Sequence, residues 1–211
     1  MRLEDWLPIY HQIVDDFGFS PEEDDRAARL LHELGKNKLL HVSVLKQLIA
    51  GKSVAIIGYV IRKEELETIK SRGEIAITAG KALVKVREID PQFIPDVHVT
   101  DMEEPELLEV KYDSLLVLHA HGDNTDKIKS IVPEVPSFVG TTQSIPFDRI
   151  YNFGGFTDGD RAALLAQEMG AARITLYGFD LHKNSGIKAK KLRWAGKILK
   201  DAGFRIKRKN T

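Results

Sequence analysis

The sequence predicts an α/β fold built on a mostly parallel sheet, and three observations support this. After Gly51, short apolar runs alternate with stretches of helical periodicity. The apolar runs are nearly continuous, as in strands that are buried on both faces. Glycine and polar residues follow almost every run, as they do where parallel strands end at a ligand crevice. Together they favour a Rossmann-like, three-layer sheet with helices on both faces, preceded by an N-terminal helical segment.

Residues 1–50 are predicted to form that helical segment, with three helices. The first spans residues 3–17, where apolar residues recur with a period near 3.6. The second begins at Ser20-Pro21-Glu22-Glu23, a capping serine followed by a first-turn proline and an acid, and ends at Gly35. The third spans residues 38–49. We expect these helices either to cover an edge of the sheet or to form a homodimer contact.

Residues 51–211 are predicted to form the α/β catalytic domain. Strands are expected at residues 53–57, 75–78, 97–99, 115–119, 137–139 and 174–177. Helices are expected at residues 63–70, 82–89, 104–110, 126–131, 160–169 and 188–200. A final edge strand is expected at residues 204–207.

The amino-acid composition excludes several classes of function. The 31 basic and 31 acidic residues cancel, which argues against nucleic-acid binding. Residues 183–209 nevertheless hold eleven Lys or Arg and one acid, either as a solvated helix face with a frayed tail or as an anion-facing surface. The absence of cysteine excludes disulfides and thiolate metal sites, and it fits the reducing cytoplasm. We find neither a secretory signal nor a membrane-spanning apolar stretch, and no P-loop, nucleophile elbow or Gly-x-Gly-x-x-Gly motif.

Two strand ends carry carboxylates that suit a cation. The fourth predicted strand runs into His119-Ala120-His121-Gly122-Asp123-Asn124, and the third ends at Thr100-Asp101. Carboxylates at neighbouring strand ends can hold Mg²⁺, which these surroundings favour over zinc. Asp101 and Asp123 could instead cap helices, and His119 could be a satisfied core histidine. We favour His121 and Asp123 as site residues.

A glycine-rich loop precedes the helix expected at residues 160–169. It contains Asn152, Gly154, Gly155, Thr157, Asp158 and Asp160, and Arg161 follows. Glycines allow close backbone approach to a ligand, and a helix N-terminus attracts phosphate. Two acids oppose direct phosphate contact unless one caps the helix and Arg161 or a metal ion balances the charge. The alternative is a turn that binds no ligand, and Asp180, after Gly178-Phe179, is either a turn former or a contact to a polar heterocycle.

In order along the chain, the motifs PDVHVTD, HAHGDN, GTTQ, NFGGFTDGDRA and YGFD, with a Lys-rich helix after them, resemble the archaeal 6-hydroxymethyl-7,8-dihydropterin pyrophosphokinases of the MptE type. The resemblance covers residues 53–204, and the core of such proteins is similar to the catalytic domain of thiamine pyrophosphokinases. It implies a pterin and ATP as substrates, Mg²⁺ as cofactor, and release of AMP after the hydroxymethyl oxygen attacks the β-phosphorus of ATP. The partners expected are therefore ATP and a small heterocyclic alcohol, with no nucleic acid and no membrane.

The resemblance also implies roles for individual residues. Asp101 and Asp123 match the acidic metal-site positions, with His121 as the third catalytic residue. The positions expected to face the nucleotide or the pterin are Gly58, Asn124, Thr141, Thr142, Gln143, Asn152, Gly154, Gly155, Thr157, Asp158, Asp160 and Asp180. The chain departs from the family pattern in three places. Tyr59 and Val60 make the loop after Gly58 bulkier, and Ala79-Gly80-Lys81 has a cation in place of a carboxylate. Glu103 has a longer acidic side chain than the family pattern has at that position. Two alternatives remain, a transferase of the same fold with another acceptor and a non-catalytic nucleotide-binding relative.

Overall fold

A computed structural model describes residues 1–181 and 185–204 of the chain. Seven parallel strands form one sheet in the order β6-β5-β4-β3-β2-β1-β7. The strands are β1 (Ser53–Ile57), β2 (Ile75–Ala79), β3 (Val97–Thr100), β4 (Leu115–Ala120), β5 (Val139–Thr142), β6 (Ile150–Tyr151) and β7 (Arg173–Tyr177). The predicted α/β class, with its parallel sheet and N-terminal helices, is confirmed.

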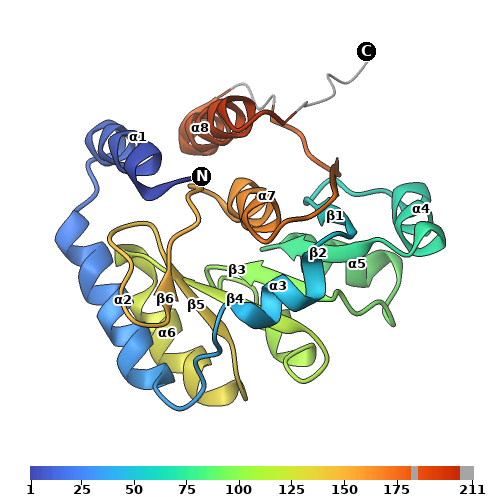
Figure 1. Cartoon of the computed structure of the whole chain (residues 1–211), viewed down its shortest axis with the longest axis horizontal. Helices are drawn as coiled ribbons and strands as arrows, with labels where there is room; N and C mark the ends of the chain where they lie inside the picture. Colours follow the sequence, from blue (N-terminus) through green and yellow to red (C-terminus); the bar gives the residue numbers. More distant parts are fainter. Residues whose placement is uncertain (182–184, 205–211) are drawn as a thin grey trace.

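Helices cover both faces of the sheet (Figure 1). The α-helices are α1 (Leu3–Phe17), α2 (Pro21–Gly35), α3 (Ser43–Ile49), α4 (Lys63–Arg72), α5 (Ala82–Ile89), α6 (Thr125–Ile131), α7 (Asp158–Glu168) and α8 (Gly186–Asp201). Three short 3₁₀ helices are η1 (Pro105–Glu109), η2 (Gly122–Asn124) and η3 (Val132–Glu134).

Successive strand residues divide between the two faces because the side-chain period of a strand is two. On β1, Ala55 and Ile57 pack in the apolar cluster beneath α4 and α5. Val54 and Ile56 pack on the opposite face, in the cluster that includes residues of α3 and α7. Every one of these four side chains is fully buried, so the near-continuous apolar run predicted a central strand correctly.

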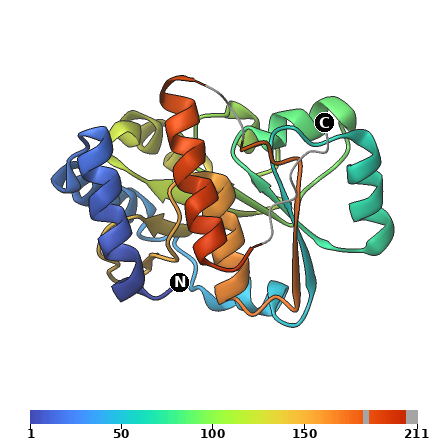
Figure 2. The ribbon, with the colours of Figure 1, turned by 90° about the horizontal axis from the view of Figure 1, so that it is seen from above.

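The N-terminal helices are integrated into this architecture. Helix α2 packs on β4 and β5 beside α6, on one face of the sheet, and α3 packs on the other face. Helices α1 and α8 lie side by side outside α7 (Figure 1 and Figure 2), where Trp6, Leu164 and Ile198 share one apolar cluster. We expected an edge cover or a dimer contact; α2 and α3 cover the faces, and the homodimer stays a prediction.

Several element boundaries differ from those predicted. The third helix begins at Ser43 rather than residue 38, because Leu39 forms a parallel bridge with Phe138 and Leu40 donates a backbone hydrogen bond to the Phe138 carbonyl (2.8 Å). The fifth strand begins two residues later than expected, the helix at 104–110 is a 3₁₀ helix, and the two-residue strand β6 was not predicted. Of the edge strand predicted at 204–207, residues 205–207 lie outside the described part of the chain.

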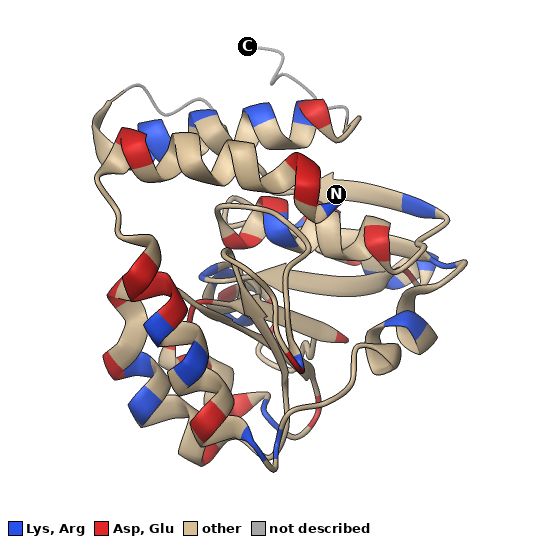
Figure 3. Cartoon of the chain, turned by 60° about the vertical axis from the view of Figure 1, so that its left-hand side comes forward, with Lys and Arg blue, Asp and Glu red and all other residues tan. Residues whose placement is uncertain are grey.

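Charges of both signs are interspersed over the ribbon (Figure 3). Within residues 1–181 and 185–204, no helix combines the length and the apolar character needed to cross a membrane.

Candidate active site

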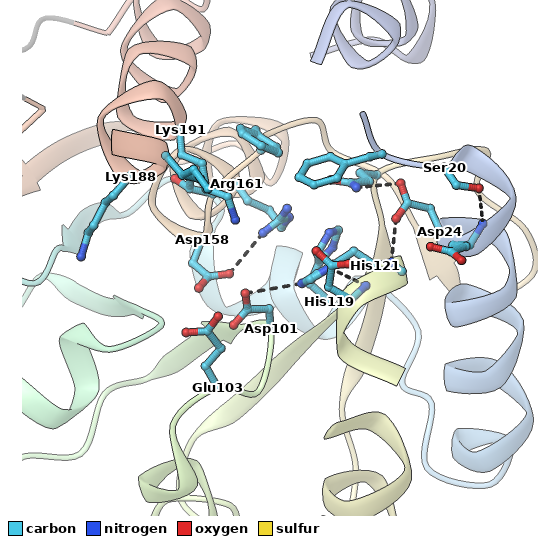
Figure 4. A pocket seen from close by; sticks show the side chains of 18 of the residues that line it. Ser20, Asp24, Asp101, Glu103, His119, His121, Asp158, Arg161, Lys188 and Lys191 are labelled. Atoms are coloured by element: carbon cyan, nitrogen blue, oxygen red, sulfur yellow. Dashed lines mark hydrogen bonds and ion pairs between the residues drawn. The ribbon is translucent and has the colours of Figure 1, made fainter. Parts of the chain in front are cut away.

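A cavity of about 610 Å³ opens at the carboxyl ends of β3, β4 and β5. The first turn of α2, the start of α7 and the start of α8 complete its wall. Its acidic residues are Glu23, Asp24, Asp101, Glu103, Glu104, Asp123 and Asp158, and its basic residues are Lys81, Arg161, Lys188 and Lys191. In Figure 4 the carboxylates of Asp101, Glu103 and Asp158 lie opposite the side chains of Lys188 and Lys191.

A tight turn after β3 presents Asp101 to the cavity. Met102 adopts a left-handed backbone conformation (φ 67°), and its N–H donates to Oγ1 of Thr100 (2.7 Å). The Met102 side chain is buried in the apolar cluster beneath the sheet, which anchors the turn. The reversal of direction leaves the intervening Asp101 side chain on the cavity side.

His121 and Asp101 face each other across the strand ends. Nε2 of His121 lies 3.6 Å from Oδ2 of Asp101, and Nδ1 accepts the backbone N–H of Asp123 (3.3 Å). Neutral His121 therefore carries its proton on Nε2, toward Asp101. Asn124 fixes the loop, since its amide donates to the carbonyls of Asp101 (2.9 Å) and His119 (2.8 Å).

The charges around Asp101 favour its ionised form. Burial alone would raise the pKa of Asp101, but the hydrogen-bonding and charge of His121 and the charge of Arg161 lower it overall. The site therefore holds a carboxylate that is negatively charged at neutral pH, which is the form that binds cations.

The start of α7 brings a second carboxylate against this one. Thr157 is the N-cap, and Asp160 accepts the backbone N–H groups of Phe156 and Thr157 (both 2.8 Å) as well as the Thr157 hydroxyl. Asp160 is thus fully buried in a capping role, which leaves Asp158 to face the cavity. Asp158 pairs with Arg161 at 3.2 Å, and the Arg161 side chain is only 4% exposed.

Asp158 and Asp101 repel each other electrostatically. The pKa of Asp158 is raised well above its usual value, first by burial and then by the negative charge of Asp101, with Arg161 acting in the opposite direction. Gly80 makes room for this carboxylate: its φ is +50°, and a Cβ there would overlap Oδ2 of Asp158. A cation bound beside Asp101 would offset the negative charge that causes this repulsion.

Two buried polar atoms of the wall have no hydrogen-bond partner among the described residues, namely Nε2 of His119 and Oε2 of Glu104. The hydroxyl of Thr141 donates to the Leu118 carbonyl (3.1 Å), so Nδ1 of His119 must supply the proton in its contact with Thr141 Oγ1 (3.1 Å). Burial, followed by the charges of Arg161 and His121, holds the pKa of His119 well below its ordinary range. His119 is therefore neutral, and its Nε2 is an acceptor.

The N-terminal segment supplies part of the wall, which the sequence interpretation missed. Asp24 on α2 is 3% exposed and accepts hydrogen bonds from the Tyr10 hydroxyl (2.6 Å), the Gln143 amide (2.7 Å) and the Gly122 N–H (2.8 Å). This carboxylate therefore joins α1, α2 and the loops after β4 and β5. The sequence offered only a helix-start signal here, because Asp24 lies in the first turn after the N-cap Ser20.

A second cavity, of about 330 Å³, lies where β1 and β7 end side by side. Strands β2 to β6 follow one another on one side of β1, whereas β7 lies on the other side of β1. The strand order therefore reverses between β1 and β7, which is where open α/β sheets bind ligands. Gly58 and Gly178 approach closely, and a Cβ on Gly58 would lie 2.6 Å from the Gly178 carbonyl oxygen. Thr157, Asp158 and Lys188 line both cavities, so the two spaces adjoin.

The structure separates the predicted site residues into three groups. Asp101, His121, Asp123, Gln143, Thr157 and Asp158 line the first cavity. Gly58 and Asp180 line the second cavity, together with Thr157 and Asp158. Asn124, Thr141, Thr142, Asn152, Gly154, Gly155 and Asp160 line neither cavity. Most of this third group supports the wall through hydrogen bonds, as when Asn152 donates to the Ser144 carbonyl (2.6 Å).

Two of the departures from the family pattern, Lys81 and Glu103, pair with each other. Nζ of Lys81 lies 2.7 Å from Oε2 of Glu103, and both side chains are more than half exposed. The added cation therefore pairs with the lengthened acid at the mouth of the cavity. Tyr59 and Val60 line the second cavity and are exposed.

The donor set fits Mg²⁺ in one particular way. Among the described residues, no group of three or more His, Asp and Glu side chains is arranged to hold a metal ion. Carboxylate oxygens are nevertheless gathered here, because Asp123 and Asp158 line the same cavity as Asp101, whose lowered pKa favours the ionised form. Mg²⁺ commonly binds through one or two carboxylates plus substrate phosphates and water, so the site suits an ion that arrives with its substrate.

Comparison with known proteins agrees with the motifs. Residues 28–186 match the family described as 6-hydroxymethylpterin diphosphokinase MptE-like. A protein of Pyrococcus furiosus named 6-hydroxymethyl-7,8-dihydropterin pyrophosphokinase is 42% identical over 95% of this chain and 85% of its own length. Proteins of the same name from Methanocaldococcus jannaschii and Methanothermobacter thermautotrophicus are 33% and 34% identical, each over 85% of this chain and over 80% and 79% of their own lengths.

The match includes the second half of α2, all seven strands of the sheet, and the loops that carry Asp101, His121, Asp123 and Asp158. The resemblance seen in the sequence motifs is thereby confirmed. This chain belongs to the family of MptE-like 6-hydroxymethylpterin diphosphokinases.

Proposed function

We propose that the chain transfers diphosphate from ATP to the hydroxymethyl group of 6-hydroxymethyl-7,8-dihydropterin in a Mg²⁺-dependent reaction of pterin cofactor biosynthesis. The products are the pterin diphosphate and AMP. The names of the relatives support the substrate class. The observation that carries the proposal is the cavity itself, in which the carboxylates of Asp101 and Asp158 lie opposite the lysines of α8.

In this proposal Asp101 and Asp123 hold the magnesium ion. Bound Mg²⁺ neutralises charge on the phosphates and helps to hold them in line for displacement. Asp101 suits this role because His121 and Arg161 keep it ionised.

The protein groups then position the reactants. The hydroxymethyl oxygen attacks the β-phosphorus while the bond from that phosphorus to the oxygen bridging it to the α-phosphate breaks. AMP departs with that oxygen, and the hydroxymethyl proton is released to solvent. Such transfers depend on positioning and electrostatic stabilisation more than on covalent chemistry by the protein. His121 orients Asp101 through Nε2 rather than accepting a proton there, because its Nδ1 already accepts the Asp123 N–H.

The direct test is incubation of the purified protein with ATP, MgCl₂ and 6-hydroxymethyl-7,8-dihydropterin, followed by chromatography. We expect equal amounts of AMP and pterin diphosphate. Asp101→Asn and Asp123→Asn should each lower kcat at least about 100-fold, the usual scale for losing one electrostatic contact to a transition state. Asp126→Asn is the matched control, because its side chain is 95% exposed on α6.

Formation of ADP, or no AMP from folded protein, would refute the proposed reaction. Unchanged turnover of both Asp variants at an unchanged melting temperature would refute the metal-site assignment while leaving the reaction intact.

A further inference from the structure

Two lysines near the start of α8 line the walls of the cavities. Lys188 and Lys191 are three residues apart and so share one face of the helix. Lys188 lines both cavities, and Lys191 lines the first. Figure 4 shows their side chains on the side of the pocket opposite Asp101 and Glu103.

Neither lysine is neutralised by a carboxylate within the part of the chain that the structure describes. Their neighbour Lys190 differs, because its Nζ lies 3.0 Å from Oδ1 of Asp16. Lys188 and Lys191 instead place their ammonium groups over the rings of Tyr59 (5.9 Å) and Phe156 (5.8 Å). A contact with an aromatic face steadies a lysine and leaves its N–H donors available.

The other cations of the first cavity are already paired. Arg161 binds Asp158, and Lys81 binds Glu103. The acidic wall by itself would repel a polyphosphate, so an anion that enters this cavity needs positive charge from the opposite side. Lys188 and Lys191 supply that charge among the described lining residues, and a metal ion at the carboxylates would supply it from the acidic side.

We propose that Lys188 and Lys191 bind the phosphate chain of the nucleotide, with Lys188 at the point where the two cavities meet. The proposal rests on the proposed function, and it selects two individual residues of the Lys-rich helix, for which the sequence left a solvated face and an anion-facing surface open. A phosphate chain in this position lies between the lysines and the acidic wall. It can then connect a substrate group bound in the first cavity to a substrate group bound in the apolar-lined second cavity, as transfer of diphosphate between two substrates requires.

The test is equilibrium binding of α,β-methylene-ATP with Mg²⁺, measured by titration calorimetry without turnover. We expect Lys188→Gln and Lys191→Gln each to weaken binding about tenfold, the affinity equivalent of one charge-assisted hydrogen bond, and the double variant to weaken it further. Affinity for the pterin alcohol should not change. Lys197→Gln is the matched control, because it lies on the same helix with its Nζ 4.7 Å from the Trp194 ring centroid and lines neither cavity.

Lys188→Arg and Lys191→Arg keep the charge and should bind within about threefold of the wild type, which separates loss of charge from misfolding. Inorganic tripolyphosphate should compete with the nucleotide in the wild type and compete more weakly in the double Gln variant. Unchanged nucleotide affinity in a folded double Gln variant would overturn the assignment of the two lysines and would leave the proposed function standing. Failure of the wild type to bind any nucleotide would overturn the proposed function, and the lysine proposal with it.

Discussion

Replacing Asp24 should destabilise the fold strongly, because this buried carboxylate connects α2 to α1 and to the loops after β4 and β5. It accepts hydrogen bonds from Tyr10, Gly122 and Gln143. Hydrogen bonds to a charged group are worth about 1.5–3 kcal/mol each, but these three share one desolvation cost, so they do not add fully. We expect Asp24→Ala to lower the free energy of unfolding by about 3–5 kcal/mol, the range for breaking a buried charged network.

The assay is urea and thermal unfolding followed by circular dichroism. For a chain of this length, about 3–5 kcal/mol corresponds to a melting temperature lowered by roughly 6–20 °C. Asp24→Asn keeps one acceptor oxygen and should lose less. Asp15→Ala is the control, because Asp15 is an exposed carboxylate on α1. A loss below about 1 kcal/mol for Asp24→Ala would refute the reasoning, since it would mean that the N-terminal helices are not held to the loops after β4 and β5 through this carboxylate.

Three further predictions follow from the same contacts. Gly80→Ala should lower activity at least about tenfold, because the added Cβ displaces the Asp158 carboxylate. Gly73→Ala is the control, because it has the same left-handed backbone penalty of about 1 kcal/mol but open space around the added Cβ. An equal loss of activity in both variants would contradict this prediction. Adding Mg²⁺ with a non-hydrolysable nucleotide should raise the melting temperature of the wild type and not of Asp101→Asn, and an equal shift in both would count against Asp101 as a ligand. The hydrogen bond from Trp194, and then that from Lys190, lower the pKa of Asp16, so its stabilising effect is present above the ordinary pKa and is lost as the pH falls through the lower folded value. Asp16→Asn should therefore lower the melting temperature at pH 7 and leave it unchanged near pH 2, and a pH-independent difference would refute this account.

The sequence by itself determined the fold class and the edge of the sheet at which the candidate site lies. Buried parallel strands read as continuous apolar runs, and polar residues follow them where the strands end. The capping signals were equally local, and Ser20 caps α2 as predicted. Local patterns of this kind can be predicted from the sequence because they depend on neighbours within a few residues.

Only the tertiary structure decided which polar residues face the cavity and which lie behind it. Asp158 and Asp160 are two positions apart in one motif, yet Asp160 turns back to cap α7 and Asp158 meets Asp101 from β3. Asp24 enters the wall through Gln143, 119 residues away, and Lys188 lines both cavities from α8, which packs against α7. Side-chain direction at a helix start and contact between distant elements depend on packing across the whole core, and no short sequence window contains that information.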